Sequence, residues 1–320
     1  MCLLLLSSSL LFGQSGDDLF NQDSQTYTYY RTYEKRLPAQ PEQFILKSSY
    51  IYGYILPLSE NLEKVAQNPA MGAELAVEMP SWNTYAWQQY LASPTLGAAF
   101  VWLNLGNNDI LGNAFALYPY MSFKVAGNSH LQLNYKVGGG LSFFTKTWNR
   151  CDTLSGVYSD TGNSAIGSVV NVYLNTAMNL NVAIYDGFAA SVDLGYSHMS
   201  NGSMLQPNGG LNILYASLGV SYDLDFRPKN NAYKSTKKLP SLPYLWSMNV
   251  VGAAGSRELY YGDNKSYLVG SLHLGATYNI NNWYSLGGGV DAFYDGAFVQ
   301  QGVTSDMTAE EKVAQRQNTT

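Results

Sequence analysis

The sequence is poor in charge, in cysteine and in long apolar runs, and each shortage excludes a class of protein. Charged residues make up 13% of the 320 residues, against roughly 25% in soluble domains, which leaves too little charge for an ordinary water-facing surface. Of the two cysteines, only Cys151 remains once an N-terminal leader is removed. An intramolecular disulfide and a cysteine-based zinc site are therefore excluded.

Two further absences bear on partners and on membrane topology. The formal net charge is −5 and the chain contains no basic run, so nothing supports nucleic-acid binding. After the first residues, no window holds the about eighteen continuous apolar residues that a transmembrane helix needs. Helical membrane spans are therefore not expected.

Tyrosine and glycine are abundant instead, with 26 tyrosines and 30 glycines. Tyrosine and tryptophan are favoured at membrane interfaces, where the ring lies in the apolar layer while its polar atom stays in water. A chain with many tyrosines and little charge is typical of an outer-membrane β-barrel.

Alternation of apolar and polar residues is the recurring pattern, and it is clearest from Val170 to Ile184. Aliphatic residues alternate there with an asparagine-rich face, which suits a lipid-facing exterior and a polar lumen. About eleven such strands are visible, and a complete barrel should have about 12 or more. They lie at 44–55, 73–79, 96–105, 113–125, 130–144, 170–184, 188–200, 212–224, 245–252, 267–280 and 283–298. We therefore predict an all-β fold, an antiparallel transmembrane barrel of the outer membrane.

The two ends of the chain differ from the middle. Residues 1–14 contain a short apolar run followed by small and polar residues, which predicts a signal peptide. Its usual basic start is absent, which indicates a start that is either clipped or misassigned. Residues 15–43 form a polar lead-in without periodicity. Residues 44–300 form the predicted barrel, and residues 301–320 form a polar tail. Because a complete bacterial barrel usually closes with an aromatic-ended strand, either the chain is truncated or this tail lies outside the barrel.

A histidine and a serine two residues apart stand out in the stretch Tyr196–Asn212, YSHMSNGSMLQPNGGLN. In a strand, residues i and i+2 share a face, so His198 and Ser200 project side by side. They share that face with the apolar residues of the preceding strand. An imidazole this close to a hydroxyl can take its proton, which makes a candidate serine nucleophile with its base.

Asn212 is predicted to join this pair. It stands an even number of residues before the alternating apolar residues of the next strand, Leu214 to Leu224, and so shares their face. The intervening Asn-Gly, Pro-Asn and Gly-Gly pairs form turns, so the two strands should make a hairpin that returns Asn212 toward His198 and Ser200. Three polar groups would then cluster on one apolar surface.

The stretch HMSNGSMLQPNGGLN resembles the H-x-S-N and P-N-x-G motifs of the PagL-type lipid A 3-O-deacylases and of the broader acyloxyacyl hydrolase-like group. Upstream, LGNAFALYPYMSF, GGGLSFFTK and NSAIGSVVN are similar to preceding segments of that group, so the resemblance spans roughly Ala73 to Leu224. It implies a bacterial outer-membrane barrel with a serine esterase site on its lipid-facing exterior. The implied substrate is lipid A or a related glycolipid, and the implied mechanism needs no metal or cofactor.

The resemblance also implies a role for each residue of the motif. Ser200 corresponds to the nucleophile, His198 to its general base, and Asn201 with Gly202 to the oxyanion hole. The third catalytic position of the family is a glutamate, and Asn212 aligns with it. An amide can hold an imidazole tautomer but cannot stabilise imidazolium by charge, and in a serine protease this change costs about 10⁴ in kcat. The departure predicts low activity, a different acid or another role.

Two alternatives to an esterase stay open. A non-catalytic outer-membrane barrel, serving as a pore or a surface-binding protein, is favoured by the asparagine-rich face and by the missing glutamate. A soluble exported β-sandwich would also alternate, although its polar faces usually carry more charge. The expected partner is a membrane lipid rather than a nucleic acid, and the sequence leaves open whether the chain forms a homodimer.

Overall fold

The computed structural model describes residues 6–12, 43–81, 88, 91, 93–128, 130–148, 163, 165–224, 246–259, 265–280 and 285–297. The chain divides into two compact units, a larger one of residues 23–201 and 207–240 and a smaller one of 1–22, 202–206 and 241–320. Each unit is described by itself.

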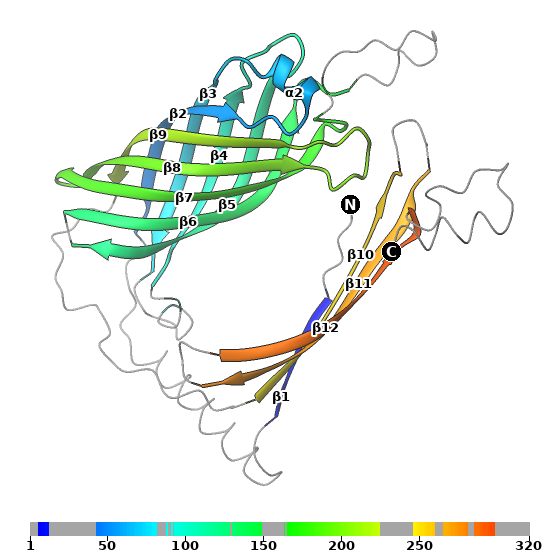
Figure 1. Cartoon of the computed structure of the whole chain (residues 1–320). Helices are drawn as coiled ribbons and strands as arrows, with labels where there is room; N and C mark the ends of the chain where they lie inside the picture. Colours follow the sequence, from blue (N-terminus) through cyan, green and yellow to red (C-terminus); the bar gives the residue numbers. More distant parts are fainter. Residues whose placement is uncertain are drawn as a thin grey trace, which may run out of the picture. The chain divides into compact units, whose positions relative to one another are not determined.

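In the larger unit, eight antiparallel strands close into a barrel (Figure 1). The strands are β2 (Ile45–Ile55), β3 (Ala70–Pro80), β4 (Thr95–Asn104), β5 (Asn113–Gly127), β6 (Leu131–Phe144), β7 (Val170–Tyr185), β8 (Phe188–Ser200) and β9 (Leu211–Asp223). Neighbours in sequence pair with each other, and β2 closes the barrel by pairing with β9 along its whole length. The predicted antiparallel barrel is confirmed, but the closed barrel has eight strands and not the 12 or more expected from the sequence.

Each strand that the alternation predicts is present, with ends that differ by a few residues. The alternation does not predict helix α2 (Glu60–Val65), which lies between β2 and β3. Ser59 caps this helix by accepting the Leu62 N–H at 3.2 Å, and the helix buries Leu62 and Val65. No helix among the described residues has the length and apolar character that crossing a membrane requires.

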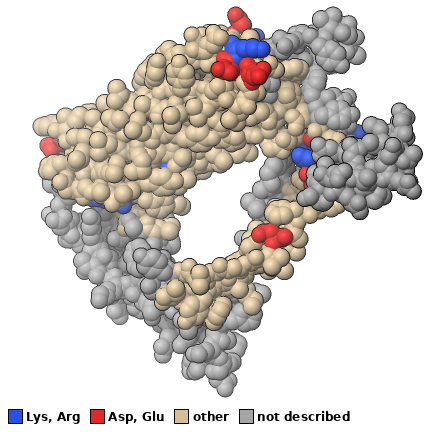
Figure 2. All heavy atoms as spheres, in the orientation of Figure 1, with Lys and Arg blue, Asp and Glu red and all other residues tan. Residues whose placement is uncertain are grey.

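The two faces of the barrel strands differ as predicted. On β7, Leu174 is 51% exposed and points outward, whereas its neighbour Asn175 is 3% exposed and points inward. The outward face is apolar on every strand, and in Figure 2 almost no charged side chain lies on the visible strand surface of the barrel. A closed barrel with this surface suits a bilayer, because lipid offers no hydrogen bonds to unpaired backbone or polar side chains.

Compensated charges occupy the barrel interior. The Lys136 ammonium lies 3.0 Å from Glu74 and 3.6 Å from Asp193, and the Lys47 ammonium lies 3.1 Å from Asp193. The Tyr118 hydroxyl donates to Glu74 at 2.5 Å. All four charged side chains are at most 5% exposed. The two ammonium groups therefore neutralise the two carboxylates in an interior where water does not reach these charges.

The asparagines of the inward face are bonded to other interior side chains. Asn175 donates to the hydroxyls of Tyr215 at 2.8 Å and Tyr173 at 3.2 Å, and Asn179 donates to Asp193. The ring of Tyr173 also packs on that of Tyr118, with 4.9 Å between centroids. Side chains thus fill this part of the lumen, where the sequence alone was compatible with a water-filled pore.

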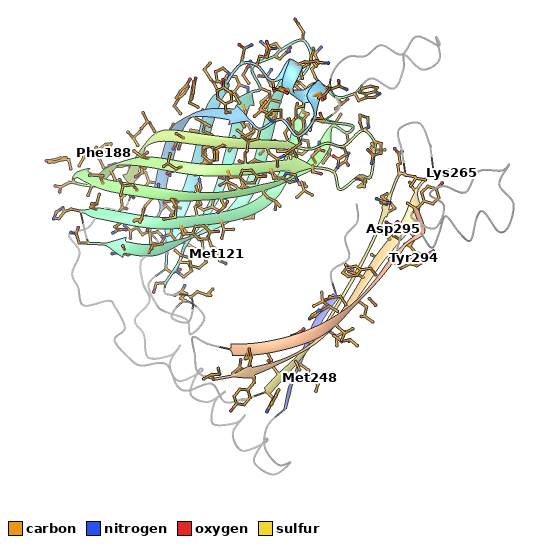
Figure 3. The ribbon with its side chains drawn as sticks, in the orientation of Figure 1. Met121, Phe188, Met248, Lys265, Tyr294 and Asp295 are labelled. Atoms are coloured by element: carbon orange, nitrogen blue, oxygen red, sulfur yellow. The ribbon has the colours of Figure 1, made fainter. Side chains whose placement is uncertain are left out.

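The smaller unit holds a four-stranded antiparallel sheet in the order β1-β10-β11-β12. Its strands are β1 (Leu6–Phe12), β10 (Trp246–Arg257), β11 (Tyr267–Asn279) and β12 (Ser285–Asp295). An ion pair of 3.1 Å joins Arg257 to Asp295, which is labelled in Figure 3.

The domain boundaries predicted from the sequence remain predictions. The last three strands of the predicted 44–300 barrel belong to the smaller sheet, and the segment predicted as a signal peptide includes β1, which pairs with β10. The lead-in up to residue 42 and the tail at 301–320 lie outside the described residues.

The interior network yields a prediction about stability. Replacing Lys136 by methionine leaves the Glu74 carboxylate without its nearest cation in a buried site, and breaking a buried pair typically costs about 3–5 kcal/mol. We expect the free energy of unfolding of Lys136→Met, measured by urea titration in detergent micelles, to fall by about that amount. The matched control is Lys124→Met, because Lys124 is exposed at the end of β5. Equal losses in the two variants would contradict the assignment.

Candidate active site

The hairpin of β8 and β9 positions the histidine and serine of the motif. His198 and Ser200 lie near the end of β8 on the outward face, together with the exposed Leu194 and Val192. Their neighbours in sequence, Ser197 and Met199, are at most 1% exposed and face inward. The outward placement predicted from strand parity is therefore confirmed.

The hairpin brings Asn212 directly opposite His198, as the turn residues predict. The two residues are partners in the β8–β9 register, and the imidazole Nδ1 lies 2.8 Å from Asn212 Oδ1. A carbonyl oxygen carries no proton, so in this hydrogen bond Nδ1 is the donor and Nε2 keeps a free lone pair. This tautomer is the one in which Nε2 can act as a base.

Asn212 has a second donor on the same oxygen. The Tyr196 hydroxyl, two residues before His198 on the same face, donates to Oδ1 at 2.5 Å. Asn212 is 5% exposed, and its Nδ2 has no hydrogen-bond partner among the described residues. Its backbone is held as well, because the carbonyl accepts the N–H of Leu56 at 2.8 Å. The amide is therefore enclosed, with both contacts on its oxygen.

Ser200 is held by Asn208 from the loop between the two strands. Asn208 Nδ2 donates to the serine Oγ at 2.9 Å, and its Oδ1 accepts the backbone N–H of Asn201 at 3.1 Å. One amide thus contacts the hydroxyl and the residue that follows it. A donor already this close to Oγ is well placed for negative charge that develops beside the serine.

The two residues predicted for the oxyanion hole have different surroundings. Asn201 is 4% exposed, and its Nδ2 donates to Ser168 Oγ at 2.8 Å. Ser168 is in turn bonded to Asn171, whose Nδ2 donates to the Ser168 carbonyl at 2.7 Å. Gly202 is exposed and adopts a φ of +64°. The side chain of Asn201 thus connects the end of β8 to the start of β7.

Gly210 explains the glycine of the motif. A Cβ at this position would lie 3.1 Å from His198 Cε1 and 3.5 Å from Ser200 Cβ, and the φ of +69° is one that side chains rarely adopt. The Gly210 N–H donates to the Ala165 carbonyl at 3.0 Å. Its bare backbone therefore packs against the imidazole and the serine without displacing either.

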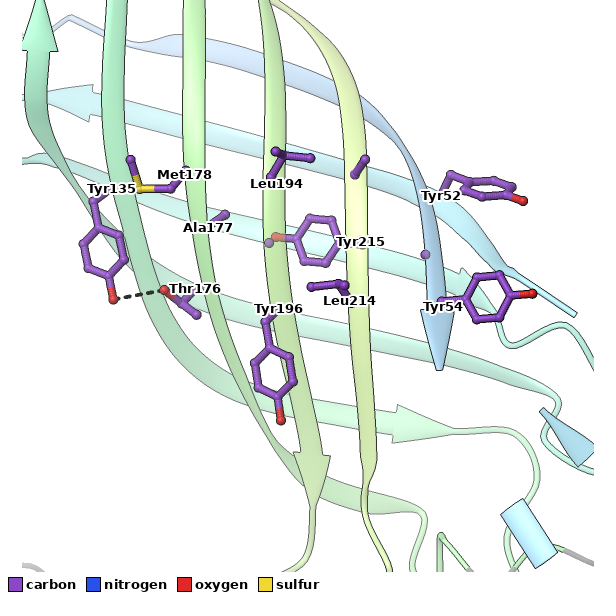
Figure 4. A pocket seen from close by; sticks show the side chains of 13 residues that line it. Tyr52, Tyr54, Tyr135, Thr176, Ala177, Met178, Leu194, Tyr196, Leu214 and Tyr215 are labelled. Atoms are coloured by element: carbon purple, nitrogen blue, oxygen red, sulfur yellow. Dashed lines mark hydrogen bonds between the residues drawn. The ribbon is translucent and has the colours of Figure 1, made fainter. Parts of the chain in front are cut away.

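An apolar groove of about 580 Å³ lies on the outer surface beside the site (Figure 4). It crosses β6, β7, β8, β9 and β2, and exposed residues such as Leu194, Leu214 and Tyr54 form its walls. Tyr196 belongs both to this groove and to the polar cluster, because its ring lines the groove while its hydroxyl bonds Asn212. Tyr196 is therefore the residue that the groove and the polar cluster share.

The site lies at the barrel end that carries the β6–β7 connection, the longest between two barrel strands. The β6–β7 connection, between residues 144 and 170, reaches the β4–β5 turn through Asn163 Nδ2 and the Ile110 carbonyl at 3.1 Å. At the opposite end, β7 and β8 are joined between Tyr185 and Phe188, and Phe188 marks that end in Figure 3. Outer-membrane barrels typically place short turns in the periplasm and longer loops outside the cell.

This arrangement has the parts of a serine nucleophile with an oriented base. An imidazole in the required tautomer shares a strand face with a hydroxyl, and an amide donor lies at that hydroxyl. No cluster of three histidine, cysteine, aspartate or glutamate side chains suited to a metal ion occurs in the part of the chain that the structure describes.

Sequence reasoning placed His198, Ser200 and Asn212 but assigned no role to Asn208 or Tyr196. Asn208 belongs to the P-N-x-G motif, and Tyr196 has the parity of His198. The motif could therefore have pointed to Asn208, and the shared strand face could have pointed to Tyr196. Which atoms meet depends on the loop conformation and the strand register, which neither signal contains.

Two family models match this chain. Residues 71–221 match the family model described as lipid A 3-O-deacylase (PagL), and residues 246–318 match the model described as acyloxyacyl hydrolase, C-terminal domain. A search of the curated proteins found no match.

Solved outer-membrane barrels are also similar to this chain. The outer membrane enzyme PagL is 18% identical, with 54% of this chain and 97% of that chain covered and a TM-score of 0.36. For Neisserial surface protein A the identity is 10%, the coverage 56% and 96%, and the TM-score 0.34. Ail, the attachment invasion locus protein of Yersinia pestis, is 11% identical, with 58% of this chain and 100% of that chain covered and a TM-score of 0.31.

A closed barrel with an apolar outer surface and a polar cluster on that surface defines a β-barrel protein of the bacterial outer membrane. Together the two family models match residues 71–221 and 246–318, so this chain is similar to the PagL-type, acyloxyacyl hydrolase-like family. The resemblance inferred from the motif is confirmed. These comparisons give no support to a homodimer.

The geometry predicts a reactive serine. In detergent, a fluorophosphonate should label the folded protein, and peptide mapping by mass spectrometry should place the label on Ser200 rather than on Ser197 or Ser203. Because general-base assistance is typically worth 10²–10⁴-fold, His198→Ala should slow labelling by about 10² or more. Labelling at another serine, or at an unchanged rate without His198, would contradict the assignment.

Proposed function

We propose that this protein is an outer-membrane serine esterase that removes an ester-linked acyl chain from lipid A or a related glycolipid. The observation that carries the proposal is the 2.8 Å contact between His198 Nδ1 and Asn212 Oδ1 on the outward surface of the barrel. Ser200 follows His198 by two residues on β8 and lies on the same face. A base oriented in this way is what a serine needs to attack an ester.

In the proposed reaction, His198 Nε2 takes the Ser200 proton as Oγ attacks the ester carbonyl. The imidazolium then gives that proton to the departing sugar oxygen, which leaves the acyl group on Ser200. Water, deprotonated by the same imidazole, attacks the acyl-enzyme and releases the fatty acid and the free serine. Each proton thus passes through His198 Nε2 while Nδ1 stays bonded to Asn212.

The oxyanion of each tetrahedral intermediate needs hydrogen-bond donors. Asn208 Nδ2 is one candidate, because it already lies 2.9 Å from Ser200 Oγ. Asn201 and Gly202, which the family resemblance suggests for this role, stay predictions. The present contacts favour Asn208, since the Asn201 amide donates to Ser168.

The position of the site supports a lipid substrate. His198 and Ser200 lie on the outward face of β8 rather than in the lumen, and the apolar groove beside Tyr196 offers a place for an acyl chain. The site lies at the end with the longer connections, which is the extracellular end of such barrels. Lipid A occupies the outer leaflet at that level.

Mass spectrometry of lipid A from cells that express the protein tests the proposal. We expect the intact protein to produce lipid A that lacks one acyl chain, and Ser200→Ala to leave acylation unchanged. Ser197→Ala is the matched control, because Ser197 lies on the same strand but faces the lumen. Heat-modifiable migration on gels verifies that each variant is folded. The proposal fails if lipid A is the same with and without the intact protein, or if Ser200→Ala deacylates it equally well.

A second candidate function, a non-catalytic barrel, is favoured by one observation. The residue opposite His198 is a neutral amide, where the family carries a carboxylate that stabilises imidazolium. A surface-binding protein would not need that charge. The pore version of this alternative is disfavoured, because Lys136, Glu74 and Asp193 are almost fully buried in the lumen.

Conductance distinguishes a pore from a filled barrel. In planar bilayers the purified protein should give no steady channels above the background of empty detergent, because interior side chains occupy the lumen. Stable channels whose conductance rises in Lys136→Ala would show that ions pass through the interior, and would favour the pore.

A further inference from the structure

The Asn212 side chain lies in a site where its two ends are not distinguished by shape. The amide oxygen and nitrogen are nearly the same size, so a rotation about the last side-chain bond exchanges them without changing the packing. Asn212 Nδ2 has no hydrogen-bond partner among the described residues. The nitrogen therefore does not select the orientation of the amide, and the two contacts on the oxygen must do so.

The orientation matters because it decides the tautomer of His198. With Oδ1 toward the ring, Nδ1 carries the hydrogen and Nε2 is free to accept a proton. With Nδ2 toward the ring, Nδ1 would have to accept, the hydrogen would move to Nε2, and the imidazole could no longer act as the base for Ser200. A carboxylate avoids this problem, since both of its ends are oxygens.

The Tyr196 hydroxyl distinguishes the two orientations. A phenolic oxygen shares its lone pair with the ring, so it is a better hydrogen-bond donor than acceptor. It donates to Asn212 Oδ1 at 2.5 Å in the observed orientation. In the reversed orientation it would have to accept from Nδ2. Tyr196 therefore favours the orientation in which His198 is a base.

We propose that Tyr196 is a positioning residue that holds the Asn212 amide with its oxygen toward His198, and so makes an amide adequate where the family has a carboxylate. The inference rests on the proposed function, because the tautomer matters only if His198 is the base. It also accounts for the contact of both the tyrosine hydroxyl and the imidazole with one oxygen of Asn212.

Tyr196→Phe is the informative change, because it removes the hydroxyl and keeps the ring that lines the groove (Figure 4). With ¹⁵N-labelled histidine, and with His198→Gln to assign the signals, NMR at a pH where imidazole is neutral reports which ring nitrogen carries the hydrogen. We expect the intact protein to be in the Nδ1–H form. In Tyr196→Phe the ratio should shift toward Nε2–H by roughly tenfold, the effect of one hydrogen bond. In ester hydrolysis, kcat should fall while KM stays unchanged.

Two controls separate positioning from packing. Tyr54→Phe removes another hydroxyl of the same groove and should leave the His198 tautomer unchanged. In an Asn212→Asp background, which has the same shape and two oxygens, Tyr196→Phe should no longer alter the tautomer.

Either of two results would overturn the inference: an unchanged tautomer in Tyr196→Phe, or an equal fall in kcat with Asn212 and with Asp at that position. The NMR measurement needs no substrate. If the protein fails to deacylate lipid A but the tautomer shifts as expected, the positioning role stands and the proposed reaction is wrong.

Discussion

The backbone pairing of β8 with β9 is the constraint on which the candidate site depends. It sets His198 opposite Asn212, and this one register relation places an acceptor at Nδ1 and leaves Nε2 free for Ser200. A slip of one residue would turn every outward side chain of β8 into the lumen, because strand side chains alternate. Such a slip would also place the polar side chains against lipid and the apolar side chains in the polar lumen, so it is unfavourable on both faces. The same burial pattern that stabilises the barrel therefore holds the site in register.

The interior and the surface divide their tasks. Inside, Lys136 and its carboxylate partners neutralise one another, so the lumen is filled by polar side chains that lipid could not solvate. Outside, polar groups are scarce, and the cluster around His198 is an exception in an apolar belt. Several of its polar groups are bonded to neighbouring ones: Asn208 Oδ1 accepts the Asn201 N–H, the Asn201 amide donates to Ser168 Oγ, and the Asn171 amide donates to the Ser168 carbonyl. Such mutual bonding lets a polar site persist at the edge of a bilayer.

Much of this fold could be predicted because alternation is a local property. The faces of Val170–Ile184, the hairpin and the outward placement of His198 and Ser200 follow from parity and turn residues alone. Parity could not show that β10, β11 and β12 form a sheet separate from the closed barrel. Whether a strand joins a barrel depends on which edge it pairs with, and alternating segments look alike in sequence. The short helix α2 was missed because its six residues leave too little periodicity to recognise.

What the sequence by itself determined is the kind of protein and the location of its site: an outer-membrane barrel with a His198 and Ser200 pair on its lipid-facing side. These depend on composition, period and motif, which are properties of residues near one another in the chain. The tertiary structure decided which atoms meet: Asn208 at Ser200, and Tyr196 with His198 on a single oxygen of Asn212. Such contacts depend on distances of a few tenths of an ångström and on the path of a loop. Only the packed barrel specifies these quantities.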